Sequence, residues 1–261
     1  MAKNITFAGQ SLQNDNWRTK NIEYRNMPNK IIDLRPLSRR DGFRVVNTYY
    51  DSKEITISGV LNQSSEAALK TTLDTMKEYL NKDEQNLDID DGSTLVRYSA
   101  TMSQFNVPEE HYHITQIPYQ IVFKCQPLGQ SQTASTLTAS FTASTYSSSF
   151  NPIGSGSPKP TLKWEITDSA SSPITGITFS NSTTGESITI TGLTMDAVGS
   201  YIEIDNDDMS VTYYDAVSSS EIDFTGIFPS FETNTNSYSV TITGGGNFEL
   251  LQTIEYYPLY L

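Results

Sequence analysis

Hydrophobic and polar residues alternate through most of the chain, which is the pattern of half-buried β-strands. Between residues 22 and 61, four segments rich in Ile, Val and Tyr are separated by turn residues such as Asp41 and Gly42. The last segment places Ile55 and Ile57 on the same side, so we expect one of its faces to be buried. The four predicted strands are NIEYR, KIIDLR, FRVVNTYY and EITISGVL.

The next segment has the period of a helix. Its apolar residues recur at intervals of three and four, and Ser64 or Ser65 is placed to cap the helix N-terminus. Glu66 then lies in the first turn, where the helix dipole favours an acidic side chain. We therefore predict one helix over about residues 65–81. Its apolar stripe consists of Leu69, Leu73, Met76 and Leu80.

Beyond the helix the chain returns to strands. A turn at residues 90–93 joins two strands into a hairpin, and a further strand ends at Cys125. Residues 129–160 are dominated by Ser, Thr, Gly and Pro and contain no charged residue before Lys159, which indicates a linker, a polar edge strand, or both. From Pro160 onward, turns recur between alternating segments as in an antiparallel sandwich.

These patterns predict a mainly β protein of two domains. The length of 261 residues suits two domains of roughly 130 residues each. We place an N-terminal β-sandwich-like domain with one α-helix at residues 1–129. The C-terminal antiparallel β-sandwich, which the Ser/Thr-rich segment enters, then comprises residues 130–261.

The net charge of -13 is distributed unevenly. Residues 1–124 contain 15 Lys and Arg against 16 Asp and Glu, a net charge of -1, whereas the remaining residues contain 2 against 14, a net charge of -12. This excess of acidic residues argues against specific nucleic-acid binding, which needs clustered cations. A nearly neutral half can pack against another copy at little electrostatic cost, whereas a strongly acidic half repels like copies.

The single cysteine and the apolar runs limit other classes. Cys125 leaves no disulfide possible within the chain, and its apolar surroundings predict a buried thiol. The first ten residues contain no apolar signal core, and no stretch approaches the roughly 20 apolar residues of a membrane span. We therefore expect synthesis in a cytoplasm and no membrane association.

Metal and catalytic chemistry have weak signals. His111 and His113 would point to one face of a strand, where Glu109 and Glu110 would complete a metal-ligand set; two solvated histidines are the simpler interpretation. No serine lies in a G-x-S-x-G elbow, and there is no phosphate-binding loop or Rossmann fingerprint. The acidic clusters at residues 88–92 and 205–208 lack the spacing of an EF-hand loop and are typical of hairpin turns. We expect no enzyme, no cofactor, and no catalytic or metal-binding residues.

The densest positive feature is a run of arginines near residue 40. One interpretation is a solvated face whose charge Asp33 and Asp41 offset. The other is a belt of ion pairs between subunits. The candidate self-association residues are Arg35, Arg39, Arg40 and Arg44.

Three stretches of the sequence resemble the distal tail protein family of siphophages, the phages with long, non-contractile tails. The first is DLRPLSRRDGFRVVNTYYDSKEITISGVL, followed by SSEAALKTTLDTMKEYL and NLDIDDGSTLVRYSATM. The second is the domain entry NPIGSGSPKPTLKWEIT. The third comprises TGESITITGL, YIEIDNDDMSVTYYD and DFTGIFPSFETNTNSYSVTI. The resemblance covers nearly the whole chain and is one of pattern and order.

This resemblance implies a virion protein of the phage tail tip. It implies an N-terminal domain akin to tail-tube subunits, a C-terminal galectin-like sandwich, and a homohexameric ring that leaves a channel for DNA. The implied partners are other copies of the chain, the tail tube protein, the tail hub or tail-associated protein, and a receptor-binding protein. DNA would pass through without specific contacts.

Two other classes of function stay open at this point. A carbohydrate-binding or adhesin module would present an exposed aromatic platform, using Trp164 or the pair Tyr256 and Tyr257. A glycosidase would need two carboxylates facing each other across a cleft, which a sequence does not reveal. Neither explains a nearly neutral half joined to an acidic one.

Overall fold

The computed structural model describes residues 4–37, 41–90, 92, 94–108, 115–168, 170–215 and 217–261. These residues form β-strands and one α-helix, which confirms the predicted mainly β fold class. They divide into two compact units. The N-terminal unit extends to Gln132 and also contains Tyr260 and Leu261, and the C-terminal unit comprises Thr133–Leu259.

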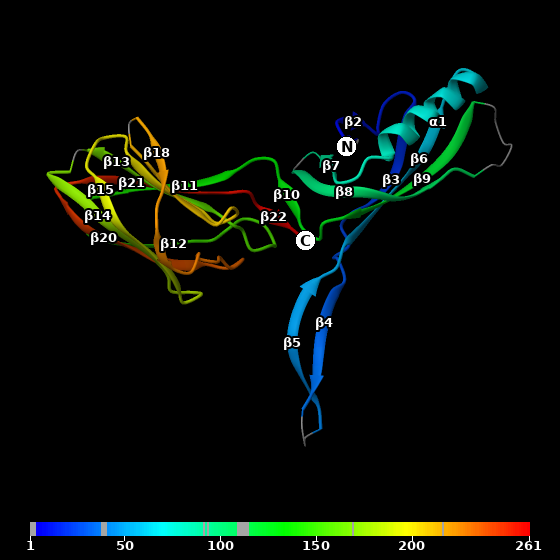
Figure 1. The fold of residues 1–261 in the computed structure, drawn as a ribbon. Helices are drawn as coiled ribbons and strands as arrows, with labels where there is room; N and C mark the ends of the chain where they lie inside the picture. The colour runs from blue at the N-terminus through cyan, green and yellow to red at the C-terminus, as the bar shows by residue number, and fades with distance from the viewer. Residues whose placement is uncertain are drawn as a thin grey trace. The chain divides into compact units, whose positions relative to one another are not determined.

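The N-terminal unit is built on a nine-stranded sheet (Figure 1). The main path of the sheet is β2-β1-β7-β8-β9-β6-β3, and β10 joins it by pairing with β8 and with β22. The hairpin expected around residues 90–93 is formed by β7 and β8. The strands are β1 (Asn4–Phe7), β2 (Gln10–Ser11), β3 (Trp17–Glu23), β6 (Lys53–Asn62), β7 (Gln85–Asp90), β8 (Leu95–Asn106), β9 (Gln116–Cys125), β10 (Gly129–Ser131) and β22 (Leu259–Tyr260).

Alternation along β6 explains how this sheet obtains a buried face. Ile55, Ile57 and Leu61 are fully buried, and the side chains between them are more exposed. Gly59 lies on the same buried face of β6. Close packing requires a glycine there, because a Cβ would collide with the carbonyl oxygen of Arg18 and the ring of Tyr119.

The helix α1 (Glu66–Leu80) packs its apolar stripe against this sheet (Figure 1). Its N-terminus begins after Ser65, whose hydroxyl accepts a hydrogen bond from the backbone N–H of Ala68 at 3.2 Å. Within the stripe, Leu69, Met76 and Leu80 are buried. Burial of this stripe in the same core as the strands fixes the helix to the sheet.

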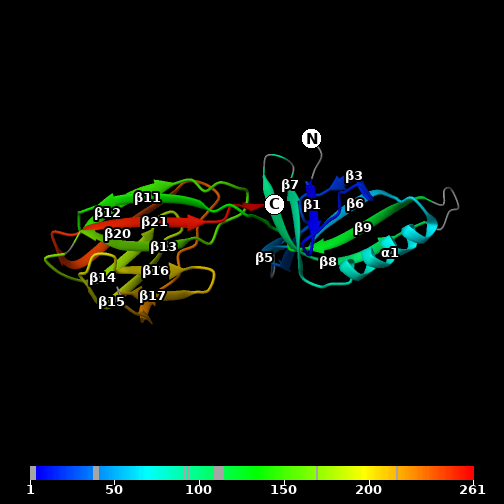
Figure 2. The same ribbon diagram turned by 90° about the horizontal axis from the view of Figure 1, so that it is seen from above.

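The C-terminal unit is a sandwich of two antiparallel sheets around one core (Figure 2). One sheet has the order β11-β21-β13-β16-β17-β18, and the other has the order β12-β20-β14-β15-β19. The strands of the first are β11 (Ser135–Phe141), β13 (Thr161–Asp168), β16 (Tyr201–Asp205), β17 (Ser210–Tyr214), β18 (Ser219–Glu221) and β21 (Glu249–Tyr256). Those of the second are β12 (Thr145–Phe150), β14 (Ser172–Asn181), β15 (Glu186–Met195), β19 (Phe224–Gly226) and β20 (Asn236–Gly246).

The segment with the Ser/Thr-rich composition contributes an edge strand to each of these sheets. β11 and β12 pair with β21 and β20, and their side chains alternate between exposed and more buried positions. The rings of Phe141 and Tyr146 stack with their centroids 4.7 Å apart, which holds together the two ends of the turn between the strands.

A buried polar network crosses the centre of the sandwich. The indole Nε1–H of Trp164 donates to Oε1 of Gln252 at 3.2 Å, and Nε2 of Gln252 donates to the Tyr238 hydroxyl at 2.7 Å. All three side chains are almost completely buried. Because a buried polar group without a partner costs about 1–3 kcal/mol, Gln252 stabilises the core through its two hydrogen bonds.

We expect Gln252→Leu to lower the free energy of unfolding by about 1–3 kcal/mol, because the indole N–H then has no acceptor. Thr253→Val on the outer side of the same strand is the matched control, with an expected change within about 0.5 kcal/mol. Chemical denaturation followed by tryptophan fluorescence measures both. Equal losses for the two variants would contradict a specific role for the network.

Candidate assembly interface

The most unusual element of the structure is a hairpin that has no core of its own. β4 (Lys30–Pro36) and β5 (Phe43–Tyr50) pair with each other and form a separate two-stranded sheet. Figure 1 shows this hairpin extending away from the nine-stranded sheet of the N-terminal unit. We call residues 30–50 the arm. An isolated two-stranded ribbon is only marginally stable in water, so the arm lacks the support that the other strands have.

Both faces of the arm are apolar and exposed. Neighbouring residues in a strand point to opposite faces, so the pairs Ile31-Ile32 and Val45-Val46 place branched side chains on each side. Every residue of β4 and all but the last of β5 are exposed, and Phe43 is 62% exposed. Soluble monomers rarely present such contiguous apolar surface. These side chains are therefore candidates for a contact surface with another chain.

The sequence signal for this surface is the adjacent apolar pairs, because a strand with one buried face would alternate. The prediction of these strands rested on composition and turn residues and not on this departure from alternation. The exposed apolar residues of the arm are Ile31, Ile32, Leu34, Leu37, Phe43, Val45, Val46 and Tyr49.

The structure places two of the four candidate arginines on the arm. Arg35 and Arg44 are Cα partners in the β4–β5 register, so their like charges lie directly opposite each other. This arrangement is unfavourable in a sheet. Neither guanidinium has a carboxylate partner among the residues that the structure describes. The other two candidates, Arg39 and Arg40, lie outside the described residues.

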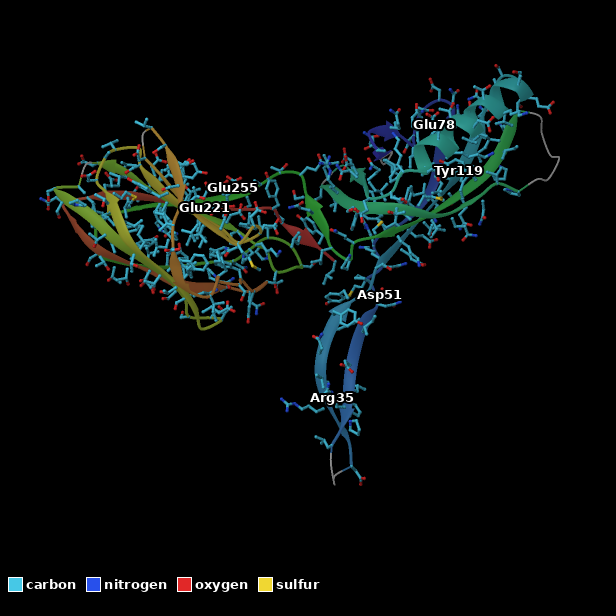
Figure 3. All side chains as sticks on the ribbon, viewed as in Figure 1. Arg35, Asp51, Glu78, Tyr119, Glu221 and Glu255 are labelled. Atoms are coloured by element: carbon cyan, nitrogen blue, oxygen red, sulfur yellow. The ribbon has the colours of Figure 1, made fainter. Side chains whose placement is uncertain are left out.

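The base of the arm is tied to the core of the N-terminal unit (Figure 3). The backbone N–H of Asp51 donates to the carbonyl of Asn29 at 2.8 Å, which closes the arm where it leaves the sheet. Two residues later Lys53 enters β6 and is 2% exposed. Its Nζ donates to the Tyr98 hydroxyl at 3.3 Å, and its Cα partner across β9 is Cys125.

Burial governs the titration of this small cluster. Burial lowers the pKa of the Lys53 ammonium, and the nearby Cys125 opposes that shift. Burial raises the pKa of the Cys125 thiol to about 12 and the pKa of the Tyr98 hydroxyl to about 12. The thiol is therefore protonated at neutral pH and is a poor nucleophile.

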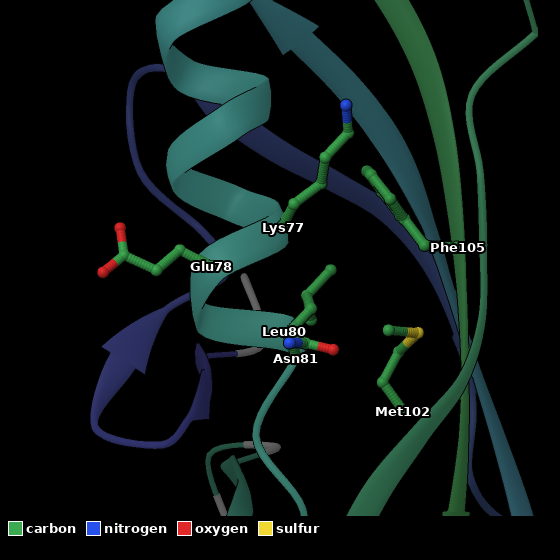
Figure 4. Close-up of a pocket in the computed structure, with 6 residues that line it drawn as sticks. All are labelled: Lys77, Glu78, Leu80, Asn81, Met102 and Phe105. Atoms are coloured by element: carbon green, nitrogen blue, oxygen red, sulfur yellow. The ribbon is translucent and has the colours of Figure 1, made fainter.

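A hollow of about 400 Å³ lies at the C-terminal end of α1 (Figure 4). Leu80, Met102 and Phe105 form its apolar part, and Lys77 and Glu78 extend from the helix beside it. The described residues that line it include no Ser, Thr or Cys and only one carboxylate, Glu78.

The acidic clusters form turns. Asp90 accepts a hydrogen bond from the N–H of Gly92, and Asp205 accepts from the N–H groups of Asp207 and Asp208. No three His, Cys, Asp or Glu side chains come together to hold a metal ion within the described ranges. The possible metal ligands Glu109, Glu110, His111 and His113 lie outside those ranges.

Two of the three aromatic residues considered for sugar stacking belong to the core. Trp164 is fully buried and Tyr256 is 5% exposed, so neither can form a platform. Tyr257 is 43% exposed. Because the proposed platform is largely internal, the carbohydrate-binding alternative loses its main support.

Comparison with known proteins gives a match in structure. No family model matches the sequence, and no curated protein matches it. The crystal structure of the Dit protein (gp 19.1) of phage SPP1 matches with a TM-score of 0.71 and 14% identity, covering 100% of both chains. This chain has the fold of a siphophage distal tail protein. The structural match confirms, at the level of fold, the resemblance seen in the sequence.

Dit of SPP1 is described as a paradigm of the hub adsorption apparatus in phages that infect Gram-positive bacteria. Two structures of the phage p2 baseplate in its activated conformation, with calcium and with strontium, match with a TM-score of 0.42 and 9% identity over 98% of each chain. Within the described residues, no helix is both long enough and apolar enough to span a bilayer.

We expect the Cys125 thiol to contribute a pH-dependent part of the stability. Its pKa is higher in the folded protein than in the unfolded chain, so its stabilising contribution is complete below pH 9 and is lost as the pH rises toward 12. The raised pKa of Tyr98 also makes the protein less stable as the pH rises, whereas the lowered pKa of Lys53 has the opposite effect on stability. From pH 9 to 11 the wild type should therefore lose about 2 kcal/mol more than Cys125→Ala. The free energies of unfolding are measured with urea at each pH. Plots against pH that run parallel for the wild type and Cys125→Ala would contradict this assignment.

Proposed function

We propose that the chain is a structural subunit of a phage tail tip that assembles into a homohexameric ring, joins the tail tube to the adsorption apparatus, and leaves a channel for DNA. The observation that carries the proposal is the arm, whose two apolar faces are left uncovered by the described residues of this chain. If the arm of one copy meets a different surface on the next copy, the contact is heterologous. Such contacts generate a ring when the rotation between copies closes.

The distribution of charge supports the same arrangement. The arm contains five cationic residues and two acidic ones, a net charge of +3, within a chain whose net charge is -13. The opposed Arg35 and Arg44 would gain from an acidic surface on a neighbouring copy. The C-terminal unit contains all of the -12 charge that follows residue 124, so the rings are best built from N-terminal units with the acidic units apart.

The resemblance to distal tail proteins suggests the other partners. The ring surfaces of the N-terminal units would contact the tail tube protein and the tail hub protein, and the C-terminal units would carry a receptor-binding protein or other components of the adsorption apparatus. The protein would act in the virion, at the tail tip, after synthesis in the host cytoplasm. Its role would be mechanical and not enzymatic.

We expect the wild-type chain to self-associate in light scattering across a concentration series, with closed rings in negative-stain images, and the double variant Val45→Ser/Val46→Ser to dissociate. Burial of each half-exposed valine contributes about 1 kcal/mol, so the two together weaken each subunit contact roughly 30-fold. The arm is solvated in the monomer, so the unfolding free energy should hardly change.

The control for this experiment is Val217→Ser. Val217 is 92% exposed on a turn of the C-terminal unit, so the substitution removes the same methyl groups from a surface that the proposal does not use. A wild-type chain that stays monomeric at every concentration and in the presence of the tail tube, or a ring that both changes weaken equally, would refute the role of the arm.

The arginines make a separate prediction about ionic strength. If Arg35 and Arg44 pair with carboxylates of the neighbouring copy, association of the wild type weakens as the salt concentration is raised from 0.05 to 0.5 M. The reason is that the screening length, about 10 Å at 0.1 M salt, becomes shorter. Arg35→Gln/Arg44→Gln should lower the affinity in low salt and flatten this dependence, whereas Val45→Ser/Val46→Ser should leave the slope unchanged. Sedimentation velocity at several salt concentrations distinguishes the two. An unchanged slope in the arginine variant would exclude these residues from the contact.

A further inference from the structure

β11 is an open edge of the six-stranded sheet in the C-terminal unit (Figure 2). It pairs with β21 on one side, and no strand of the described chain pairs with its other side. An edge strand presents a row of unpaired backbone N–H and C=O groups. These groups form a ready template for one more strand.

Protection against such pairing is absent from β11. The chain has no charged residue between Lys124 and Lys159, and the seven residues of β11 include no proline. The register with β21 continues without a bulge from Ser135 to Phe141. Charges, prolines and bulges are the usual devices by which proteins block an edge.

Apart from β12, which is also uncharged and has an unbroken register, several edges of the two units show these devices. In the N-terminal unit the edge strand β3 carries Arg18, Lys20 and Glu23 and has a bulge in its register with β6. At the opposite side of the sandwich, β18 and β19 have only three residues each. β11 is therefore longer, smoother and less charged than the protected edges.

Side chains on β11 are arranged to accept a neighbouring strand. Thr136, Thr138 and Ser140 are exposed on the outer face and are small. Leu137 and Ala139 point toward the core and are only partly buried, because the sheet ends there. A strand added beside β11 would cover these two residues with its inward side chains and would lie flat beside the outer ones.

The charge of the outer face determines what kind of strand fits. Glu255 on β21 is the Cα partner of Thr136, and Asp205 follows across Thr161 in the same row. Strands lie about 4.8 Å apart, so a Lys or Arg on an added strand reaches past the short Thr136 side chain to the Glu255 carboxylate. Burial raises the pKa of the nearby Glu203 carboxyl; Asp205 and Glu255 raise it further, and Lys163 opposes them.

We propose that β11 binds, by strand addition, an extended segment of a different protein whose outward side chains include Lys or Arg. A second copy of this chain is disfavoured as the occupant, because edge-to-edge pairing would bring two units with a charge of -12 together. The inference goes beyond the ring assembly and does not rest on it, because the arm and β11 belong to different units.

A synthetic peptide with the sequence Lys-Val-Thr-Val-Lys-Val-Thr is the probe for this site. It places valines inward and basic or hydroxyl side chains outward. We expect saturable binding to the full chain, measured by fluorescence anisotropy, with hydrogen-exchange protection of β11 amides and none of β12. Absence of saturable binding up to millimolar peptide would overturn the proposal.

Two protein variants separate strand pairing from charge. Thr138→Lys places a charge on the edge and should weaken binding at least about 10-fold. Ser147→Lys makes the same change on the exposed face of β12, the other uncharged edge, and should alter binding less than about 2-fold. Equal losses would show that net charge alone attracts the peptide and would overturn the proposal. Glu255→Gln should weaken binding about 3-fold by removing the proposed ion pair.

Backbone methylation tests the hydrogen bonds directly. Alternate N–H groups of a strand point to opposite edges. Two peptides are therefore compared, one methylated at the valine nitrogens and one methylated at the lysine and threonine nitrogens. One peptide should lose binding and the other retain it; identical behaviour of the two would contradict strand addition. Light scattering on Thr138→Lys should give the wild-type mass, so the outcome at β11 is read independently of ring formation.

Discussion

An isolated β-ribbon cannot bury side chains on both of its faces, and the arm of this protein has apolar residues on both. A two-stranded hairpin has no second layer, so every side chain of β4 and β5 meets solvent unless another molecule covers it. The arm continues directly into the core of the N-terminal unit. β6 leaves the arm and enters the centre of the core at once, with Lys53, Ile55 and Ile57 buried in succession along one face.

The two units satisfy opposite requirements. The N-terminal unit combines a nearly neutral charge with an apolar projection, which favours contact with other copies. The C-terminal unit buries its aromatic residues around Trp164 and Phe179 and exposes a carboxylate-rich sheet face, which keeps copies of that unit apart. One chain thus has two surfaces of different chemistry, an apolar arm and an acidic sheet face.

The open edge at β11 adds a second kind of contact to the molecule. The arm would bind through apolar side chains, whereas β11 would bind through backbone groups, with charge choosing the occupant. In the proposed assembly, such a division would let a ring form first and receive further proteins afterwards. The Dit protein of SPP1 shares this fold over the full length at 14% identity, so two very different sequences specify the same fold.

The sequence by itself determined the strands, the helix and the contrast in charge. These depend on local periodicity: the stripe containing Leu69 and Met76 required a helix, and the alternation around Ile55 and Ile57 required a strand with one buried face. Pattern and order along the chain were also enough to indicate the distal tail protein fold. Only the tertiary structure decided which strands have uncovered faces or an unpaired edge. Ile31 and Leu162 look alike in sequence, but one is exposed on the arm and the other is fully buried in the sandwich, because burial depends on which residues far along the chain pack against each. The sequence likewise showed Arg35 and Arg44 only as members of a charged run. The pairing of β4 with β5 showed that they lie opposite each other.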